Sequence, residues 1–256
     1  MEYGICHLNC VAIREDPSDQ SEMVTQLLFG ELFQVLDRHG DWIKVLLDYD
    51  YYEGWVDSKQ VLHLDQDAYR GITASDRYFC NEIITFIEDR QNCPQILTLG
   101  AQLPFYNGSH FKLGDISMAF DGEVISGKMP KSNLVNTAYK FLNAPFLWGG
   151  RTLFGVDCSG FTQLVYRING YQLFRDAHQQ ASQGEVLSFI EECEPGDLAF
   201  FDNEEGEIVH CGILLDNNYI IHCHGKVRID RIDSSGIYNV DTKRHTHKLR
   251  VMKQLF

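Results

Sequence analysis

Long hydrophobic runs are missing from this chain of 256 residues, and their absence argues against a membrane-spanning protein. No stretch approaches the roughly 18 consecutive apolar residues that a membrane-spanning helix needs. The first residues, Met1 to His7, have neither the basic flank nor the apolar centre of a signal peptide. For the chain as written, we therefore expect no membrane span and a cytoplasmic location.

Positive charge is also scarce. The 22 Lys and Arg residues are outnumbered by 36 Asp and Glu residues, which gives a formal net charge of -14. A surface of this sign repels phosphate backbones and anionic lipid. We therefore expect no nucleic acid partner and no binding to a membrane surface.

Closely spaced cysteine pairs are missing as well, because the 8 cysteines are scattered without a C-x-x-C motif. Disulfide frameworks belong to short secreted chains, so reduced thiols are expected here. His210 and Cys211 supply possible metal ligands, as do His222 and Cys223, but neighbouring positions on a strand point to opposite faces. One tetrahedral site cannot easily use both members of each pair, and we expect no metal and no cofactor.

Residues 1–65 contain short apolar stretches separated by glycine and polar turns, the pattern of a small β-barrel. The motifs G-E-x-x-x-V-L, W-x-K-V and Y-x-G-W-V resemble those of a bacterial SH3-like domain. Residues 70–127 are harder to interpret. Apolar residues at helical spacing predict a helix within 74–90, and the strand-like stretches that follow suggest a second, degenerate SH3-like barrel.

Residues 130–256 change pattern, with helical stretches first and strand-like stretches after them. This order is typical of an α+β domain. The expected fold class is therefore a multidomain protein with one or two small SH3-like β-barrels followed by an α+β papain-like domain.

The chemistry is concentrated in Gly155-Val156-Asp157-Cys158-Ser159-Gly160-Phe161. A thiolate is the reactive form of cysteine, and a helix N-terminus favours it through the positive dipole end and the free backbone N–H groups. Cys158 stands after a glycine-rich loop and before an apolar helical run. We predict that Cys158 is a nucleophile whose backbone N–H helps to form an oxyanion hole.

A cysteine nucleophile needs a base, and the base needs a partner that orients it. His210 and His222 lie on consecutive predicted strands joined by Asp216-Asn217-Asn218, so a hairpin would bring their imidazoles close. His210 is the expected base, and His222 is expected to hold His210 in the useful tautomer. His224 shares strand parity with His222 and is a rival on geometry alone.

Four motifs in this order resemble the NlpC family of papain-like cysteine peptidases: F-L-W-G-G-R-T-x-x-G-V-D-C-S-G-F, P-G-D-L-A-F-F, H-C-G-I-L-L and I-I-H. The resemblance implies a catalytic triad of Cys158, His210 and His222. One position departs from the family pattern, because Phe146 stands where a tyrosine is usual. This departure bears on fine specificity more than on the reaction.

The N-terminal barrels resemble those of the family's γ-D-glutamyl-L-diamino acid endopeptidases. That resemblance implies hydrolysis of the γ-D-glutamyl bond in murein peptides, L-Ala-γ-D-Glu-diamino acid, during recycling or turnover of cell-wall peptides. It also implies that Glu31, Tyr52, Asp157 and Ser159 bind the free amine of the first L-alanine. Two alternatives stay open: a catalytically silent module that binds wall fragments, and a related amidase or acyltransferase.

Overall fold

The computed structural model describes residues 2–88, 93–114 and 116–256, and the chain divides into two compact units. Unit 1 comprises residues 1–128 together with 151–153, and unit 2 comprises residues 129–150 and 154–256. Separate hydrophobic cores lie within unit 1 and within unit 2. Among the described residues, no helix is both long enough and apolar enough to cross a membrane.

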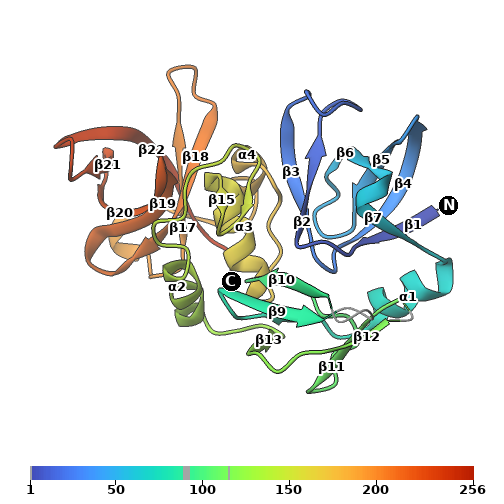
Figure 1. The fold of residues 1–256 in the computed structure, drawn as a ribbon. Coiled ribbons are helices and arrows are strands. Elements are labelled where there is room, and N and C mark those ends of the chain that lie inside the picture. Colours follow the sequence, from blue (N-terminus) through green and yellow to red (C-terminus); the bar gives the residue numbers. More distant parts are fainter. Residues whose placement is uncertain (1, 89–92, 115) are drawn as a thin grey trace. The chain divides into compact units, whose positions relative to one another are not determined.

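The first part of unit 1 is a small antiparallel barrel of seven strands in the spatial order β3-β2-β6-β5-β4-β1-β7 (Figure 1). Its elements are β1 (Glu2–Cys6), β2 (Cys10–Arg14), β3 (Met23–Leu28), β4 (Leu32–His39), β5 (Trp42–Leu47), β6 (Glu53–Asp57), the 3-10 helix η1 (Ser58–Gln60) and β7 (Val61–Leu64). Strand β5 shows why this sequence forms a barrel. Ile43, Val45 and Leu47 are buried in its core, and the residues between them are half-buried.

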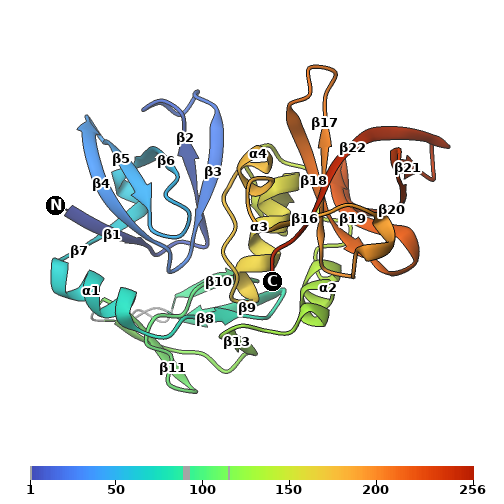
Figure 2. The ribbon, with the colours of Figure 1, turned by 180° about the vertical axis from the view of Figure 1, so that it is seen from behind.

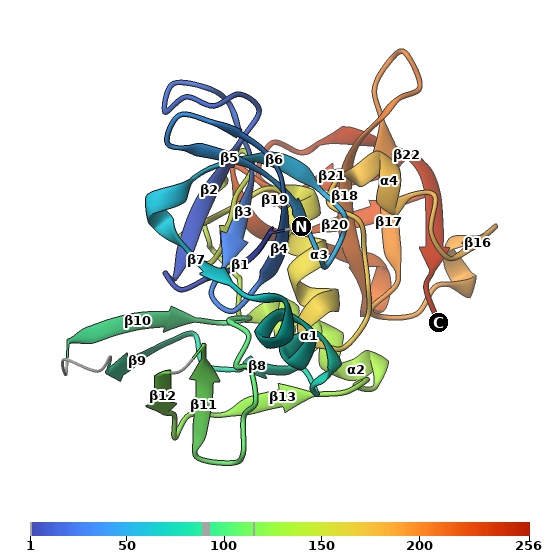
Figure 3. The same cartoon turned by 90° about the vertical axis from the view of Figure 1, so that its right-hand side faces the viewer.

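The rest of unit 1, where it is described, contains the nine-residue helix α1 and three two-stranded antiparallel ladders, β8–β13, β9–β10 and β11–β12 (Figure 3). The elements are α1 (Gln66–Ala74), β8 (Tyr78–Cys80), β9 (Ile84–Glu88), β10 (Pro94–Thr98), β11 (His110–Leu113), β12 (Ile116–Ala119), β13 (Val124–Ser126) and β14 (Arg151–Thr152). Phe111 packs edge-on against Phe29 of the barrel, with ring centroids 5.8 Å apart. The two parts therefore share a core, and a second SH3-like barrel over residues 70–127 stays a prediction.

The helix expected within 74–90 is wrong for the described part of that range, whose last two residues lie outside the description. Phe79 lies in β8, and β9 follows from Ile84. In β9, Ile87 is buried and Phe86 is 65% exposed, which is the two-residue alternation of a strand. Apolar residues at helical spacing also fit two short strands, and pairing with β13 and β10 satisfies their backbone groups.

Unit 2 is an α+β domain, and the predicted class is confirmed (Figures 1 and 2). Its sheet has the order β16-β22-β17-β18-β19-β20-β21, and β22 also pairs with β21, which closes the run of strands. The elements are α2 (Lys131–Tyr139), β15 (Gly155–Val156), α3 (Cys158–Ile168), α4 (Ala177–Gln180), β16 (Glu185–Leu187), η2 (Ile190–Glu192), β17 (Leu198–Asp202), β18 (Ile208–Leu215), η3 (Asp216–Asn218), β19 (Tyr219–His224), β20 (Lys226–Asp233), β21 (Gly236–Asn239) and β22 (Arg244–Gln254).

Helix α3 is the central helix of unit 2 and packs against β18 and β19. Every residue from Ser159 to Ile168 is buried, and Phe161 meets Phe141 edge-on with ring centroids 5.6 Å apart. Burial of this kind stabilises a helix mainly through tertiary packing. The first turn of α3 is thereby fixed beside the strands that carry the histidines.

Candidate active site

Cys158 is the first residue of α3, as the sequence predicts. Asp157 is the N-cap: its backbone is extended, and its side chain accepts a hydrogen bond from the N–H of Gly160 at 2.6 Å. The positive end of the helix dipole therefore lies at Cys158, where it favours a thiolate. Cys158 is half-buried, whereas Cys211 and Cys223 are fully buried.

His210 and His222 are brought together by the hairpin of β18 and β19. Asn217 and Asn218 make the turn with φ near 60°, a conformation that asparagine tolerates. Nε2 of His210 lies 2.9 Å from Nδ1 of His222. Gly212 stands opposite His222 in the register, and a Cβ there would lie 2.8 Å from the Cβ of His222, so glycine makes room for that side chain.

The sulfur of Cys158 has hydrogen-bonding partners in both Cys211 and His210. The pKa of Cys158 lies well below its usual value because the Cys211 thiol donates to its sulfur and because His210 stabilises the thiolate, although burial acts in the opposite direction. Burial lowers the pKa of His210 to about 4, against the opposing effect of Cys158. An acidified thiol thus faces an imidazole that is neutral at pH 7, an arrangement suited to proton transfer.

A β-bulge lies next to His210 and helps to aim its side chain. The register pairs Phe201 with His210 but Asp202 with Ile208, so Val209 is the extra residue. Bulges re-aim side chains and recur beside active sites. The ring of His247, from β22, stacks on His210 with centroids 4.2 Å apart. The His210 ring is therefore held between His222 on one side and a stacked imidazole on another.

Asp230 is a residue of this network that sequence reasoning missed. It lies on β20 and is fully buried, and its Oδ2 is 3.1 Å from Nε2 of His222. Arg228 donates to both of its oxygens, at 2.6 and 2.9 Å. Burial alone would raise the pKa of Asp230, but hydrogen bonds from His222, Arg228 and the N–H of Val240 bring it to about 2.

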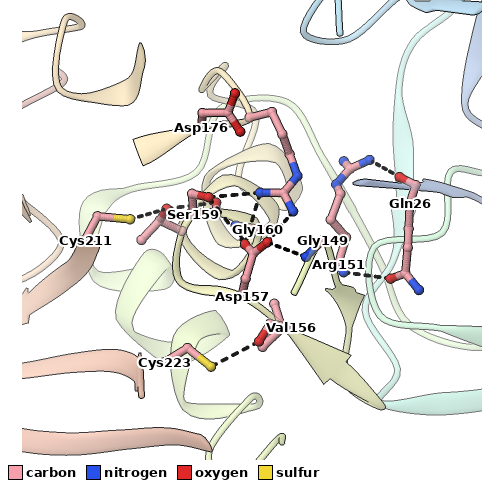
Figure 4. A network of polar contacts seen from close by, with 12 residues as sticks. Gln26, Gly149, Arg151, Val156, Asp157, Ser159, Gly160, Asp176, Cys211 and Cys223 are labelled. Carbon is pink, nitrogen blue, oxygen red and sulfur yellow. Dashed lines mark hydrogen bonds and ion pairs between the residues drawn. The ribbon is translucent and has the colours of Figure 1, made fainter. Parts of the chain in front are cut away.

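Arg175 is the second residue that sequence reasoning missed. Its guanidinium donates to Oδ1 and Oδ2 of Asp157, at 3.0 and 2.5 Å, and to Oγ of Ser159 at 2.9 Å. The N–H groups of Gly149 and Gly160 also reach the Asp157 carboxylate, as Figure 4 shows. Asp157 and Ser159 are thus both bound by one buried arginine, the first residue of the segment Arg175-Asp176-Ala177-His178-Gln179-Gln180.

Gln180 is the last residue of the same segment and fixes the opposite side of the first turn of α3. Its Nε2 donates to the carbonyl of Ser159 at 3.0 Å, and its Oε1 accepts from Oγ1 of Thr162 at 2.7 Å. The thiol of Cys211 lies 3.7 Å from the same Oε1. Arg175 and Gln180 thus begin and end one short segment, R-D-A-H-Q-Q, and this segment is the sequence signal that could have identified both supporting residues.

Glu31 belongs to unit 1, and its carboxylate accepts hydrogen bonds from residues of that unit. Both of its oxygens accept from the guanidinium of Arg151, at 2.9 and 3.0 Å, and the N–H of Leu28 donates to Oε2 at 2.8 Å. Gln26 binds Arg151 as well, as Figure 4 shows. Tyr52, also in unit 1, is half-buried and packs against the barrel core. The roles of Glu31 and Tyr52 in substrate binding stay predictions.

His224 is less well placed than His222. Its side chain is exposed, and its ring centroid lies 6.5 Å from that of His210, compared with 5.1 Å for His222. The hydrogen bond between His210 and His222 therefore favours the pair that the sequence motifs select. In the described ranges, no group of three or more His, Cys, Asp or Glu side chains is arranged to hold a metal ion.

Known proteins resemble this chain in sequence and in fold. Residues 143–247 match the NlpC/P60 family, and residues 13–61 match the bacterial dipeptidyl-peptidase Sh3 domain. A γ-D-glutamyl-L-lysine dipeptidyl-peptidase of Bacillus subtilis (strain 168) is 30% identical over 221 residues, which cover 77% of this chain and 71% of that protein. A protein of the same name from Bacillus cereus is 26% identical over 228 residues, covering 80% and 68%.

The fold agrees with these matches. The crystal structure of an NlpC/P60 family protein from Bacillus cereus ATCC 10987 superposes with a TM-score of 0.82 and covers 99% of each chain, at 19% identity. At this identity the likeness shows the fold alone. Together with the matches of sequence, it identifies this chain as a member of the NlpC/P60 family of cysteine peptidases, with a bacterial SH3 domain in its N-terminal part.

Proposed function

We propose that this peptidase hydrolyses the bond between γ-D-glutamate and a diamino acid in cell-wall peptides that begin with a free L-alanine. The proposed role is turnover or recycling of these peptides. Cys158 is the proposed nucleophile, His210 the base and His222 the residue that orients the base.

The observation that carries the proposal is the contact between Cys158 and His210. The sulfur shares a hydrogen bond with His210, and the pKa of Cys158 is lowered first by the thiol of Cys211. His222 fixes the far side of the His210 ring at 2.9 Å. Nucleophile, base and orienting group thus form one connected chain, which is the general pattern of activated-nucleophile catalysis.

The reaction that this chain supports has two halves. The Cys158 sulfur attacks the γ-carbonyl carbon of D-glutamate as its proton passes to His210. The carbon–nitrogen bond then breaks, His210 returns the proton to the departing amino group, and a thioester remains on Cys158. Water activated by His210 hydrolyses the thioester, which releases the γ-D-glutamate product and restores the thiol. We expect the backbone N–H of Cys158 to donate to the oxyanion in both halves.

The substrate class rests on the resemblance and on the relatives, whose name specifies a γ-D-glutamyl-L-lysine bond. Recognition of the free amine by Glu31, Tyr52, Asp157 and Ser159 is part of the proposal. The ion pair with Arg151 bears on its test, because Glu31→Ala would leave a buried guanidinium without its carboxylate. Glu31→Gln keeps a hydrogen-bond acceptor and is the cleaner variant. It should raise KM for a free-amine peptide and change little with an N-acetylated one.

Defined peptides test the reaction. L-Ala-γ-D-Glu-L-Lys and L-Ala-γ-D-Glu-diaminopimelate are incubated with the wild type and with Cys158→Ala, and the products are separated by mass. We expect cleavage at the γ-D-glutamyl bond and no cleavage by the variant. Cys193→Ala, which alters a half-buried thiol beside η2, is the matched control and should cleave normally. Cleavage by Cys158→Ala at the wild-type rate would refute the proposal.

A thiol probe separates the peptidase from a silent binding module. Iodoacetamide at pH 7 should modify Cys158 much faster than the other thiols, because only thiolates react and the pKa of Cys158 is lowered. Burial raises the pKa of Cys193 to about 11, so that thiol is a slow internal reference. Equal modification of both would favour the binding module. A related amidase or acyltransferase would show the same thiol reactivity but a different product profile.

A further inference from the structure

The buried carboxylate of Asp230 has contacts that point beyond structural support. In the register, Asp230 pairs with Ile220, and Arg228 pairs with His222. Oδ1 accepts from Arg228 and from the backbone N–H of Val240, and Oδ2 accepts from Arg228 and lies 3.1 Å from Nε2 of His222. A buried acidic group is expected to have such partners. One of them is the imidazole that orients the proposed base.

Asp230 is ionised at neutral pH. Burial favours its neutral form, but the hydrogen bonds to its oxygens outweigh burial and hold its pKa near 2. An ionised carboxylate can only accept hydrogen bonds. The short contact with His222 therefore requires a proton on Nε2 of that ring.

This requirement propagates along the pair of imidazoles. A neutral His222 with its proton on Nε2 has a lone pair on Nδ1, so the 2.9 Å contact requires Nε2–H of His210 as donor. A neutral His210 with its proton on Nε2 has an unprotonated Nδ1. That nitrogen is then the one able to take the proton of Cys158.

We propose that Asp230 is a positioning residue that sets the tautomers of His222 and His210 and so leaves Nδ1 of His210 free to act as the base. This inference rests on the proposed roles of Cys158 and His210. When Cys158 attacks, one proton passes from its sulfur to Nδ1 of His210, and none moves to Asp230. The imidazolium keeps donating through Nε2 to His222, and the carboxylate stabilises its charge through that ring.

Asparagine at position 230 would reverse the arrangement. Arg228 donates to both oxygens, so the amide nitrogen of Asn would meet a guanidinium N–H on either side. On the Oδ1 side it would also meet the backbone N–H of Val240, which cannot become an acceptor, so the amide oxygen is expected on that side. The amide nitrogen then faces His222, which can adapt by moving its proton to Nδ1. Nε2 of His210 would have to accept, its proton would move to Nδ1, and no base would face Cys158.

Kinetics on the peptide substrate test this inference. Asp230→Asn should lower kcat by about 10²- to 10⁴-fold, the range that loss of a general base or of its tautomer gives, with KM changed less than about threefold. The alkylation rate of Cys158 should lose its wild-type pH profile. Asp241→Asn is the matched control, because it removes the other carboxylate bound to Arg228, which is 71% exposed, without touching His222. It should keep kcat within about twofold.

Wild-type kcat and pH profile in a folded Asp230→Asn would overturn the inference, as would an equal loss in Asp241→Asn. A second measurement keeps Asp230 intact and so does not depend on whether Asp230→Asn folds. Nitrogen-15 NMR of histidine in Cys158→Ser distinguishes the two tautomers, and we expect the protons of His210 and His222 on Nε2. A proton on Nδ1 of either ring would refute the inference. The outcome of Cys158→Ala decides the proposed function separately.

Discussion

Replacing Arg175 with methionine probes how much one buried guanidinium contributes to the first turn of α3. Methionine keeps the length and apolar stem of the side chain but removes its charge and its donors. In the wild type, the side chain of Arg175 is 1% exposed and that of Asp157 is 10% exposed. The substitution therefore leaves a carboxylate that is almost fully buried without its counter-ion.

The expected loss of stability follows from these contacts. Removing one partner of a buried ion pair typically costs about 3–5 kcal/mol. Asp157 keeps the N–H groups of Gly149 and Gly160 and the hydroxyl of Ser159 as donors, which offsets part of the loss. We therefore expect a value near the lower end, about 3 kcal/mol. For comparison, Arg38→Met breaks a pair with Glu2 that is 47% and 58% exposed, and it should change the stability little because water screens that pair.

Hydrogen exchange is the suitable assay because the chain has two units and a single unfolding transition is not assured. Peptides covering α3 report the opening of unit 2 directly. A loss of about 3 kcal/mol corresponds to a fall of roughly 10²-fold in their protection. The double variant Asp157→Asn with Arg175→Met removes the orphaned charge while keeping a good N-cap residue.

The double variant shows whether the unpaired charge of Asp157 causes the loss of stability in Arg175→Met. If the buried charge dominates, the double variant should be about 1–2 kcal/mol more stable than the sum of the two single changes predicts. Additive losses would show that the charge is not the source of the effect. Protection of α3 in Arg175→Met equal to that in Arg38→Met would refute the assigned role of Arg175.

Two further predictions concern the thiol and the histidines. Cys211→Ala should raise the pKa of Cys158, because it removes the thiol that donates to the sulfur and favours the thiolate. The pH dependence of Cys158 alkylation measures this change, and Cys211→Ser, which retains a donor, is the control. An unchanged profile in the Ala variant would contradict the prediction. Burial lowers the pKa of His210 and of His247 to about 4. Unfolded imidazoles bind protons from about pH 6.5 downward, so stability should fall between pH 6.5 and 4 by about 1.4 kcal/mol per pH unit for each ring. Hydrogen exchange of peptides from β18 and β22, measured across this pH range, reports the stability of unit 2. In His247→Gln the stability should depend less steeply on pH than in the wild type, and an equal dependence would contradict the prediction.

Local sequence patterns were enough to predict that a helix begins at Cys158 and that a hairpin brings His210 close to His222, whereas the choice of His222 over His224 came from the family resemblance and the catalytic roles stay predictions. The glycine-rich approach and apolar run around Cys158 predict a helix start, and a helix begins there. The three polar residues between two apolar runs predict a hairpin, and the hairpin brings His210 beside His222. The helix start and the hairpin depend on neighbours within about a dozen residues, so both can be predicted from short stretches of sequence.

The residues that support the site depend on packing between distant segments. Arg175 is 18 residues from Asp157 in the chain, and Arg151 is 120 residues from Glu31. No local periodicity encodes such pairs. The wrong prediction of a helix within 74–90 has a related cause. A short apolar stretch fits a helix and a strand equally well, and only the position of its strand partners decides between them.

The Asp230 carboxylate is bound by the N–H of Val240, in the segment between β21 and β22, and Arg228 links it to the solvent-facing Asp241. The acid–base behaviour of the proposed catalytic pair is thus tied to a surface segment that is not part of the nucleophile's own helix. A change in that segment that withdraws the N–H of Val240 from Asp230 would therefore be expected to alter the proposed proton transfer, while every group proposed to meet the peptide is left intact.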